Sequence, residues 1–250
     1  GSEMCIRDRC TAINHMADEL SNADAMKNEF ISSVSHELRT PLTAIRGWAE
    51  TIRTERDPVI FKKGIRVITN ETERLSQMVE ELLDFSRMQS GHFTLQQSAM
   101  DVLAELGEAA LIYAERAKIE DITMTYEEPE MLPVVYGDKN RIRQVFINII
   151  DNAIKYSNRG GTVKIVAGTS PEGDIRVTVE DNGCGIRKSD LPKIKTKFYK
   201  ANHTKKGSGI GLAVADEIIQ MHGGTLTLES EEGKGTKVTI TIPPQKTEDK

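Results

Sequence analysis

Two long series of apolar residues at helical spacing constrain the fold of the first third of this chain more than any other feature. In each series the apolar side chains recur every three, four or seven positions, which is the spacing of one buried helix face. The first series comprises Phe30, Val34, Leu38, Leu42, Ile45, Trp48 and Ile52. The second comprises Phe61, Ile65, Ile68, Leu75, Met78, Leu82 and Phe85. Because Arg56-Asp57-Pro58 interrupts the pattern, it predicts two helices, over about Thr11–Thr54 and Val59–Gln89, in an antiparallel hairpin.

A lone hairpin of this kind leaves each apolar face half covered. A second copy of the chain would cover both faces, so the pattern predicts a dimeric four-helix bundle. Pro41 falls inside the first predicted helix, where its missing N–H and its ring predict a kink near His36.

From Ser90-Gly91 onwards the pattern changes to alternating strands and helices, which is typical of an α+β sandwich. The segments expected as strands are Phe93–Gln96, Ile122–Tyr126, Thr162–Gly168, Asp174–Glu180, Thr225–Leu228 and Lys237–Ile242. The segments expected as helices are Met100–Lys118, Lys139–Tyr156 and Gly209–His222. The polar tail after Pro243-Pro244 is expected to be disordered.

Composition narrows the class of protein. The net charge of −5 argues against a nucleic-acid binder. The 3 cysteines, an odd number, make no disulfide framework and favour a reducing compartment. No apolar run reaches the roughly 18 residues that a membrane span needs.

His36 is the residue whose placement most suggests reactivity. It follows Val34 by two positions, about 200° around a helix, and therefore points away from the apolar face into water. Glu37 comes directly after it, and Thr40 lies one turn further on the same face as His36. An exposed imidazole beside a carboxylate suggests a reactive group, and a solvated surface histidine is the alternative.

A second polar cluster lies on the predicted helix Lys139–Tyr156. Asn148, Asn152 and Lys155 are four and three positions apart and share one face. Asparagine has a low helix propensity, so two of them aligned with a lysine suggest a binding site. An amide oxygen is a suitable ligand for Mg²⁺ and a lysine suits phosphate, whereas the alternative is a solvated polar face.

Three glycine-containing turns complete the candidate site. Asp181–Ile186 follows a predicted strand, where an acid can accept a hydrogen bond from an exocyclic amine and glycines can admit a flat ligand. Gly207–Leu212 opens a helix, whose N-terminal N–H groups favour an anion. Gly233–Thr236 precedes the last predicted strand. Each of the three, taken alone, is also compatible with an ordinary turn.

In this order, the segments resemble the motifs of the sensor histidine kinases of two-component systems. Ser35–Leu42 is similar to that family's H box, Asn148–Tyr156 to its N box, Asp181–Gly185 to its G1 box, Lys197–Tyr199 to its F box and Gly207–Leu212 to its G2 box. The resemblance covers about Asn28–Pro243.

The resemblance implies a division of the chain into domains. A dimerisation and phosphotransfer domain is expected over residues 28–90, and a catalytic ATP-binding domain of the gyrase and heat-shock-chaperone type over 91–244. Residues 1–27 would be the remnant of a signalling linker, similar to the last helix of a HAMP segment, and 245–250 a tail.

The resemblance also implies roles for individual residues. His36 would accept the γ-phosphoryl group of ATP, Glu37 would take up a proton, and Thr40 would orient water for dephosphorylation of a partner. Asn152 and Asn148 would hold Mg²⁺. The residues implied at the nucleotide, with Asp181 reading adenine, are Asn148, Asn152, Lys155, Tyr156, Asp181, Gly183, Gly185, Ile186, Phe198, Lys200, Gly207, Ser208, Gly209, Gly211, Leu212 and Thr236.

The partners implied are a second copy of the chain and the receiver domain of a response regulator, within the cytoplasmic part of a bacterial inner-membrane sensor. Lys195 and Thr196 depart from the family pattern, because they stand where the F box usually has a second aromatic residue and an acid. Two other functions remain open. One is a dimeric scaffold that binds ATP without phosphate transfer. The other is an ATPase or chaperone of the same nucleotide fold, which Asn148 disfavours because it stands where those proteins usually have a glutamate base.

Overall fold

The structure of the chain is a computed structural model, which describes residues 16–17, 21, 31–32, 34–90, 93–195, 199 and 209–244. The chain divides into two compact units, and the boundary in its first half falls between Glu80 and Glu81. Most of the linker predicted over residues 1–27, and the whole of the predicted tail 245–250, lie outside the described residues.

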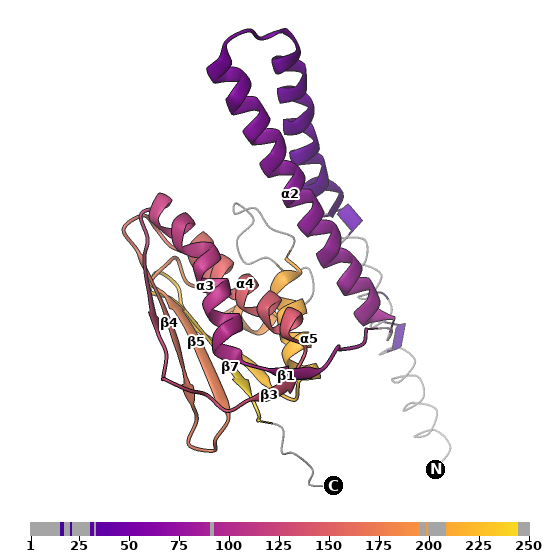
Figure 1. Cartoon of the computed structure of the whole chain (residues 1–250). Helices are drawn as coiled ribbons and strands as arrows, with labels where there is room; N and C mark the ends of the chain where they lie inside the picture. The colour runs from indigo at the N-terminus through magenta and orange to yellow at the C-terminus, as the bar shows by residue number, and fades with distance from the viewer. Residues whose placement is uncertain are drawn as a thin grey trace, which may run out of the picture. The chain divides into compact units, whose positions relative to one another are not determined.

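The first unit is a helical hairpin (Figure 1). Residues 34–54 are helical without interruption at Pro41, and α2 spans Pro58–Gln89. The Asp57 carboxylate accepts a hydrogen bond from the Val59 amide at 2.8 Å and so caps the first turn of α2. The break predicted between the two helices is confirmed, and the kink at Pro41 stays a prediction.

A glycine allows the two helices of the hairpin to approach each other closely. A Cβ atom on Gly64 would overlap the Ile52 side chain and would lie 3.0 Å from Trp48 Cε3. The ammonium nitrogen of Lys63 lies 5.7 Å from the centre of the same indole ring. The helices are therefore tightly packed in this region.

Elsewhere the hairpin keeps large apolar side chains on its surface. The exposed fraction is 54% for Leu42, 75% for Val59, 48% for Phe61 and 44% for Ile65. An exposed apolar surface of this kind is typical of a helix face that packs against another protein surface.

The second unit is built on a five-stranded mixed sheet with the strand order β2-β4-β5-β7-β6. Its strands are β2 (Thr123–Glu127), β4 (Thr162–Thr169), β5 (Ile175–Asp181), β6 (Thr225–Glu231) and β7 (Gly235–Ile242). β2 pairs in parallel with β4, and the other neighbours are antiparallel. Three helices cover one face of this sheet (Figure 1), namely α3 (Val102–Ile119), α4 (Lys139–Tyr156) and α5 (Gly211–Met221). The predicted fold class, a helical hairpin followed by an α+β sandwich, is confirmed.

The core of the second unit lies between the sheet and these helices. Alternate residues of the central strands are buried, as expected for strands with one covered face. The largest fully buried side chains are Phe146, Leu106, Ile142, Ile149, Ile150, Ile154, Ile165, Ile175, Ile210, Ile218, Ile219 and Leu226. α4 supplies five of them, so the helix that carries the predicted N box is firmly fixed.

The start of α4 is held by two side chains. The Asp138 carboxylate accepts hydrogen bonds from the amides of Asn140 and Arg141 at 3.1 and 3.2 Å. The buried His222 accepts a hydrogen bond from the Asp138 amide through Nε2 at 3.0 Å and donates from Nδ1 to the Ile218 carbonyl at 2.7 Å. Since one ring nitrogen accepts and the other donates, these contacts require neutral His222.

One predicted strand is wrong, and three short elements were not predicted. Residues 93–96 are not a strand, because Phe93 is buried with the Arg141 guanidinium 4.8 Å from its ring centre, and the Gln96 amide donates to Asp138 at 2.9 Å. The strand is instead β1 (Ser98–Met100), which pairs with the unpredicted β3 (Val135–Gly137). The 3₁₀ helix η1 (Leu191–Lys193) was also not predicted.

Among the helices that the structure describes, none is both long enough and apolar enough to span a bilayer.

Candidate functional site

The histidine singled out by the sequence lies on the first helix of the hairpin. His36 is exposed and Glu37 is half-buried, which agrees with a reactive imidazole that faces water. One turn later, the Thr40 hydroxyl donates to the His36 carbonyl at 3.3 Å. This bond holds the threonine hydroxyl against the backbone of the turn that carries the histidine.

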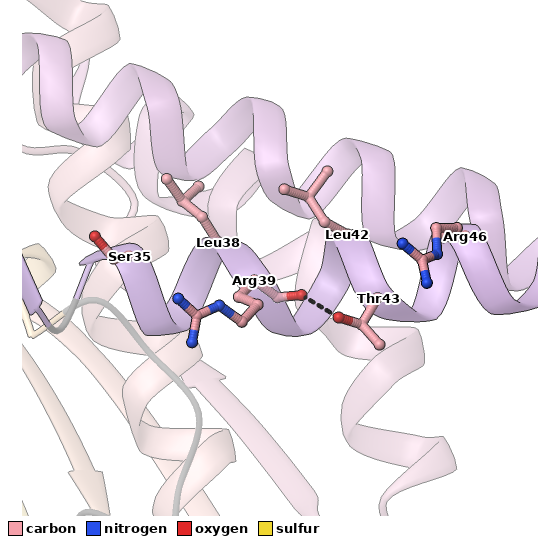
Figure 2. Close-up of a pocket in the computed structure, with 6 residues that line it drawn as sticks. All are labelled: Ser35, Leu38, Arg39, Leu42, Thr43 and Arg46. Carbon is pink, nitrogen blue, oxygen red and sulfur yellow. Dashed lines mark hydrogen bonds between the residues drawn. The ribbon is translucent and has the colours of Figure 1, made fainter.

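A groove runs along the helix face next to His36. It is lined by Ser35, Leu38, Arg39, Leu42, Thr43 and Arg46 (Figure 2). The residues recur at steps of three and four, so they form one continuous stripe. Arg39 and Thr43 lie on its side nearest to His36, and the Thr43 hydroxyl donates to the Arg39 carbonyl at 2.8 Å. The stripe therefore offers cations and apolar surface close to the histidine.

The first asparagine of the predicted N box, Asn148, lies at the contact between α4 and the start of α5. Asn148 is buried, and its Nδ2 atom donates to the Gly211 carbonyl at 3.3 Å. A Cβ atom on Gly211 would lie 3.4 Å from Asn148 Cγ, so glycine permits this approach. Asn152, one turn further along α4, is half-buried. The predicted N box and the helical end of the predicted G2 box are thus in direct contact.

The acid of the predicted G1 box lies at the end of β5. Asp181 is buried, and its Oδ1 atom accepts from the Gly183 amide at 2.9 Å. Burial raises the pKa of the Asp181 carboxyl, while the hydrogen bonds from the Gly183 and Thr236 amides act in the opposite direction. The side chain is therefore a desolvated acceptor held by two backbone donors.

The glycines around Asp181 pack against protein backbone. A Cβ atom on Gly183 would overlap the Tyr156 carbonyl, and one on Gly185 (φ 64°) would overlap the Glu231 carbonyl. Gly235 (φ 117°) packs in the same way against the Asp181 carbonyl. These glycines are required by the fold itself, in addition to any approach of a ligand.

Hydrogen bonds connect this turn to its neighbours. The Cys184 amide donates to the Tyr156 carbonyl at 3.1 Å, which links the turn to the end of α4. The Ile186 amide donates to the Ser230 hydroxyl at 2.8 Å, and that hydroxyl lies 2.9 Å from the Thr236 hydroxyl. The structure therefore brings the predicted N box, G1 box and Thr236 together through direct bonds.

The other predicted nucleotide residues are placed as follows. The ammonium nitrogen of Lys155 lies 5.1 Å from the ring centre of Tyr156. Gly209 has φ 69° and directly precedes the buried Ile210, and Leu212 is half-buried in the first turn of α5. Four further residues lie outside the described part of the chain, namely Phe198, Lys200, Gly207 and Ser208.

Two ion pairs organise the segment after Ile186. The buried Asp190 carboxylate accepts from Arg187 and from the Tyr199 hydroxyl, both at 2.8 Å. The Tyr199 hydrogen bond and the Arg187 contact lower the pKa of Asp190, and the same hydrogen bond raises the pKa of Tyr199. Lys195, one of the two departures from the family pattern, pairs with Asp216 of α5 at 2.8 Å and also donates to the Leu226 carbonyl.

Sequence reasoning missed the charged contacts between α3 and α4. Arg116 pairs with Glu120 at 2.8 Å and with Asp151, the residue before Asn152. Burial and the Asp151 carboxylate together raise the pKa of Tyr113. No local spacing signals such contacts, because Arg116 and Asp151 are 35 positions apart in sequence.

The donor set of α4 fits a magnesium ion that is shared with a phosphate ligand. Among the described residues there is no cluster of three or more histidine, cysteine or acidic side chains that could hold a metal. Asn148 and Asn152 offer neutral amide oxygens, which are hard ligands, and Mg²⁺ commonly takes few protein ligands together with water and phosphate oxygens.

Comparison with known protein families identifies two matches. Residues 26–91 match the His Kinase A (phospho-acceptor) domain. Residues 137–246 match the histidine kinase-, DNA gyrase B- and HSP90-like ATPase domain. The two matches include His36 and the whole of α4, β5, α5 and β7.

Curated relatives cover nearly the whole chain. The chain is 34% identical over 243 residues to the sensor histidine kinase WalK of Bacillus subtilis, and this match covers 94% of this chain and 40% of WalK. It is also 34% identical over 230 residues to the sensor protein SrrB of Staphylococcus aureus, covering 89% of this chain and 39% of SrrB. The chain therefore spans about two fifths of the length of these relatives.

Solved structures share the fold. The Acinetobacter baumannii histidine kinase AdeS matches with a TM-score of 0.64 and 29% identity, over 84% of this chain and 98% of that chain. The histidine kinase ThkA, in a complex with the response regulator protein TrrA, matches with a TM-score of 0.65 and 28% identity, over 87% of this chain and 61% of that chain.

Proposed function

We propose, because the chain belongs to the sensor histidine kinase family, that it transfers the γ-phosphoryl group of ATP to its own His36 and then to an aspartate of a response regulator. The observation that carries the proposal is an exposed His36 followed by a half-buried Glu37 on a helical hairpin, together with Asp181, Asn148 and Asn152 on the contacting elements β5 and α4 of the ATPase fold. The first group supplies the phosphate acceptor and the second supplies the nucleotide site.

The reaction at His36 begins with the neutral imidazole. One ring nitrogen attacks the γ-phosphorus, a P–N bond forms, and the bond from that phosphorus to the bridging oxygen of ADP breaks. The proton on the other ring nitrogen becomes acidic as positive charge develops, and Glu37 accepts it. The exposure of His36 supports this role, because an imidazole that faces water can be reached by a nucleotide held on the second unit.

The second unit binds and orients the nucleotide. Asp181 accepts a hydrogen bond from the adenine amine, for which its buried carboxylate is already fixed by two backbone donors. Asn152 and Asn148 would hold Mg²⁺, which would supply charge neutralisation at the phosphates when bound. The remaining nucleotide contacts are proposed for Lys155, Tyr156, Gly183, Gly185, Ile186, Phe198, Lys200, Gly207, Ser208, Gly209, Gly211, Leu212 and Thr236.

A phosphatase activity towards the regulator is proposed for Thr40. Its hydroxyl donates to the His36 carbonyl one turn earlier, which leaves its lone pairs available to orient a water molecule beside the histidine. Thr40→Ala is expected to keep autophosphorylation within about twofold and to lose most regulator dephosphorylation, because only the second reaction uses the hydroxyl. The two rates are measured with purified regulator, and an equal loss of both would refute the role.

We also propose the assembly and the setting of the protein. A second copy covers the exposed Leu42, Val59, Phe61 and Ile65 of the hairpin and completes a dimeric four-helix bundle. The partner that receives the phosphate is a response regulator receiver domain, as the complex of the similar ThkA with a regulator suggests. The parent protein is a bacterial inner-membrane sensor of which this chain is a cytoplasmic part.

The alternative function is a dimeric scaffold that binds ATP without transferring phosphate. The departure at Lys195 is the observation that favours it, since the F box is altered there. However, Lys195 pairs with Asp216 and donates to the Leu226 carbonyl. The lysine at this position of the F box therefore makes structural contacts of its own.

An autophosphorylation assay with radiolabelled ATP tests the proposal. The wild-type chain is expected to incorporate label that is lost in acid and survives base, as a phosphohistidine does. His36→Gln is expected to lose at least about 99% of that label and to keep nucleotide affinity, because it removes only the nucleophile. Label that persists in His36→Gln would refute the acceptor, and a wild-type chain that binds ATP without label would favour the scaffold.

A further inference from the structure

A polar cluster around the buried Asp84 connects the last turns of α2 to the start of α4. Asp84 of α2 is 6% exposed, and its Oδ2 atom accepts from Arg141 Nη1 and, at 3.2 Å, from Gln144 Nε2. Arg141 Nη1 also donates to Gln144 Oε1 at 2.9 Å, so the three side chains are mutually hydrogen-bonded. Phe93 also packs against the Arg141 guanidinium, whose carbon lies 4.8 Å from the ring centre of Phe93.

The cluster lies wholly inside the second unit. α2 runs from Pro58 to Gln89 as one helix, yet its residues from Glu81 onwards belong with the ATPase fold. Asp84 is therefore a residue of the hairpin helix that is built into the catalytic unit. No local sequence pattern predicts this contact, since Asp84 and Arg141 are 57 positions apart.

The partners of Asp84 lie on the same helix face as the nucleotide residues. Arg141, Gln144, Asn148 and Asn152 follow one another on α4 at steps of three, four and four, which is one continuous stripe. Asp84 binds the first two members of this stripe, and the other two are the proposed magnesium ligands. A rigid helix thus joins the buried carboxylate to the nucleotide site.

We propose that Asp84 is a positioning residue for phosphoryl transfer, which acts through Arg141 and Gln144 to fix α4 relative to the end of α2. The inference rests on the proposed kinase function. A buried carboxylate with two donors fixes direction as well as distance, since Arg141 presents a planar group that Phe93 also holds. Through the contact of Asp84 with Arg141 and Gln144, the placement of Asn148 and Asn152 depends on the last turns of α2.

The expected signature is a loss in turnover without a loss in nucleotide binding. Asp84→Asn keeps the size of the side chain and removes its charge, so the Arg141 guanidinium loses its ionic partner. Autophosphorylation kcat is expected to fall roughly tenfold or more, while the KM for ATP and the dissociation constant for a fluorescent nucleotide stay within about twofold. A merely structural residue would instead change stability and nucleotide affinity together.

Three further variants make the assignment specific. Arg141→Lys keeps the charge and loses the planar group, and it is expected to reproduce most of the loss of Asp84→Asn. The double variant that combines Asp84→Asn with Arg141→Lys is expected to be no slower than the slower single variant, because both substitutions remove the same contact. Glu80→Gln, which removes an exposed carboxylate from α2 one turn earlier, is the matched control and is expected to retain wild-type kcat.

The outcomes separate this inference from the proposed function. A wild-type chain that takes up no acid-labile label refutes the kinase itself. If the wild type is labelled but Asp84→Asn keeps its kcat, the positioning role is refuted. Parallel losses of kcat, nucleotide affinity and melting temperature in Asp84→Asn refute it as well. Additive losses in the double variant also refute it, whereas a non-additive loss confined to kcat supports it.

Discussion

The two units of this protein differ in how far a single chain completes them. The ATPase unit has its own core, in which the three helices and the sheet bury a long series of large apolar side chains. The hairpin unit packs closely at Gly64 but leaves residues such as Val59 and Phe61 exposed. The difference indicates that the unit proposed to bind the nucleotide is complete within one chain, whereas the proposed dimer concerns the hairpin that carries His36.

The largest effect is expected when one glycine of each unit is replaced by alanine and the losses of stability are compared. Gly235→Ala places a Cβ against the Asp181 carbonyl at φ 117°, where backbone cannot move aside, and is expected to destabilise the ATPase unit by about 3 kcal/mol or more. Gly64→Ala meets side-chain atoms of Ile52 and Trp48 and no backbone atom, so it is expected to cost less, about 1–2 kcal/mol. Thermal unfolding followed by circular dichroism measures both, and equal losses would break the contrast.

A smaller effect is expected from the exposed surface of the hairpin. Phe61→Ser with Ile65→Ser removes two exposed apolar side chains and is expected to weaken self-association by about 2–3 kcal/mol, or roughly a hundredfold in the dissociation constant. Leu111→Ser, at a residue of α3 that is 76% exposed, is the matched control on the ATPase unit. Sedimentation at several concentrations measures the difference. A wild-type chain that stays monomeric would contradict the proposed bundle.

The smallest effect concerns Asp181. Since burial raises the pKa of this carboxyl, its contribution to stability is present below the unfolded pKa and is lost as the pH rises through the folded pKa. Asp181→Asn should therefore keep or slightly raise stability at pH 7, while it weakens ATP binding by about 1–2 kcal/mol through the lost charged acceptor. Nucleotide titration and unfolding at pH 5 and pH 7 check both parts, and a joint loss would mean that Asp181 is needed for the fold.

The elements with strong local signals were predicted well. α4 begins and ends at the predicted residues because Asp138 caps it and its apolar period is regular. The break before α2 at Pro58 was also predicted from a local signal, because Arg56-Asp57-Pro58 interrupts the apolar pattern. The sequence does not predict the β1–β3 pair, because three-residue strands show no period. The strand predicted at Phe93–Gln96 is wrong, because the apolar Phe93 packs against an arginine.

Residues of the candidate site divide in the same way, into those with a local sequence signal and those without one. Motif residues such as Asp181 and Asn148 were found from their turns and helix face, and the structure places them near the predicted neighbours. The ion pairs of Asp84, Arg116 and Lys195 join segments that are far apart in sequence. Only the fold brings these partners together, so no local pattern could reveal them.

The continuity of α2 has a consequence for how the protein can be cut. The boundary between the two units falls inside this helix, between Glu80 and Glu81, so no extended linker exists at that point. Proteases cleave extended, exposed backbone and attack hydrogen-bonded helix slowly. Limited digestion is therefore expected to leave the bond between Glu80 and Glu81 intact, and a fragment designed to carry the ATPase unit alone should begin upstream of Glu81 so that Asp84 keeps its helix.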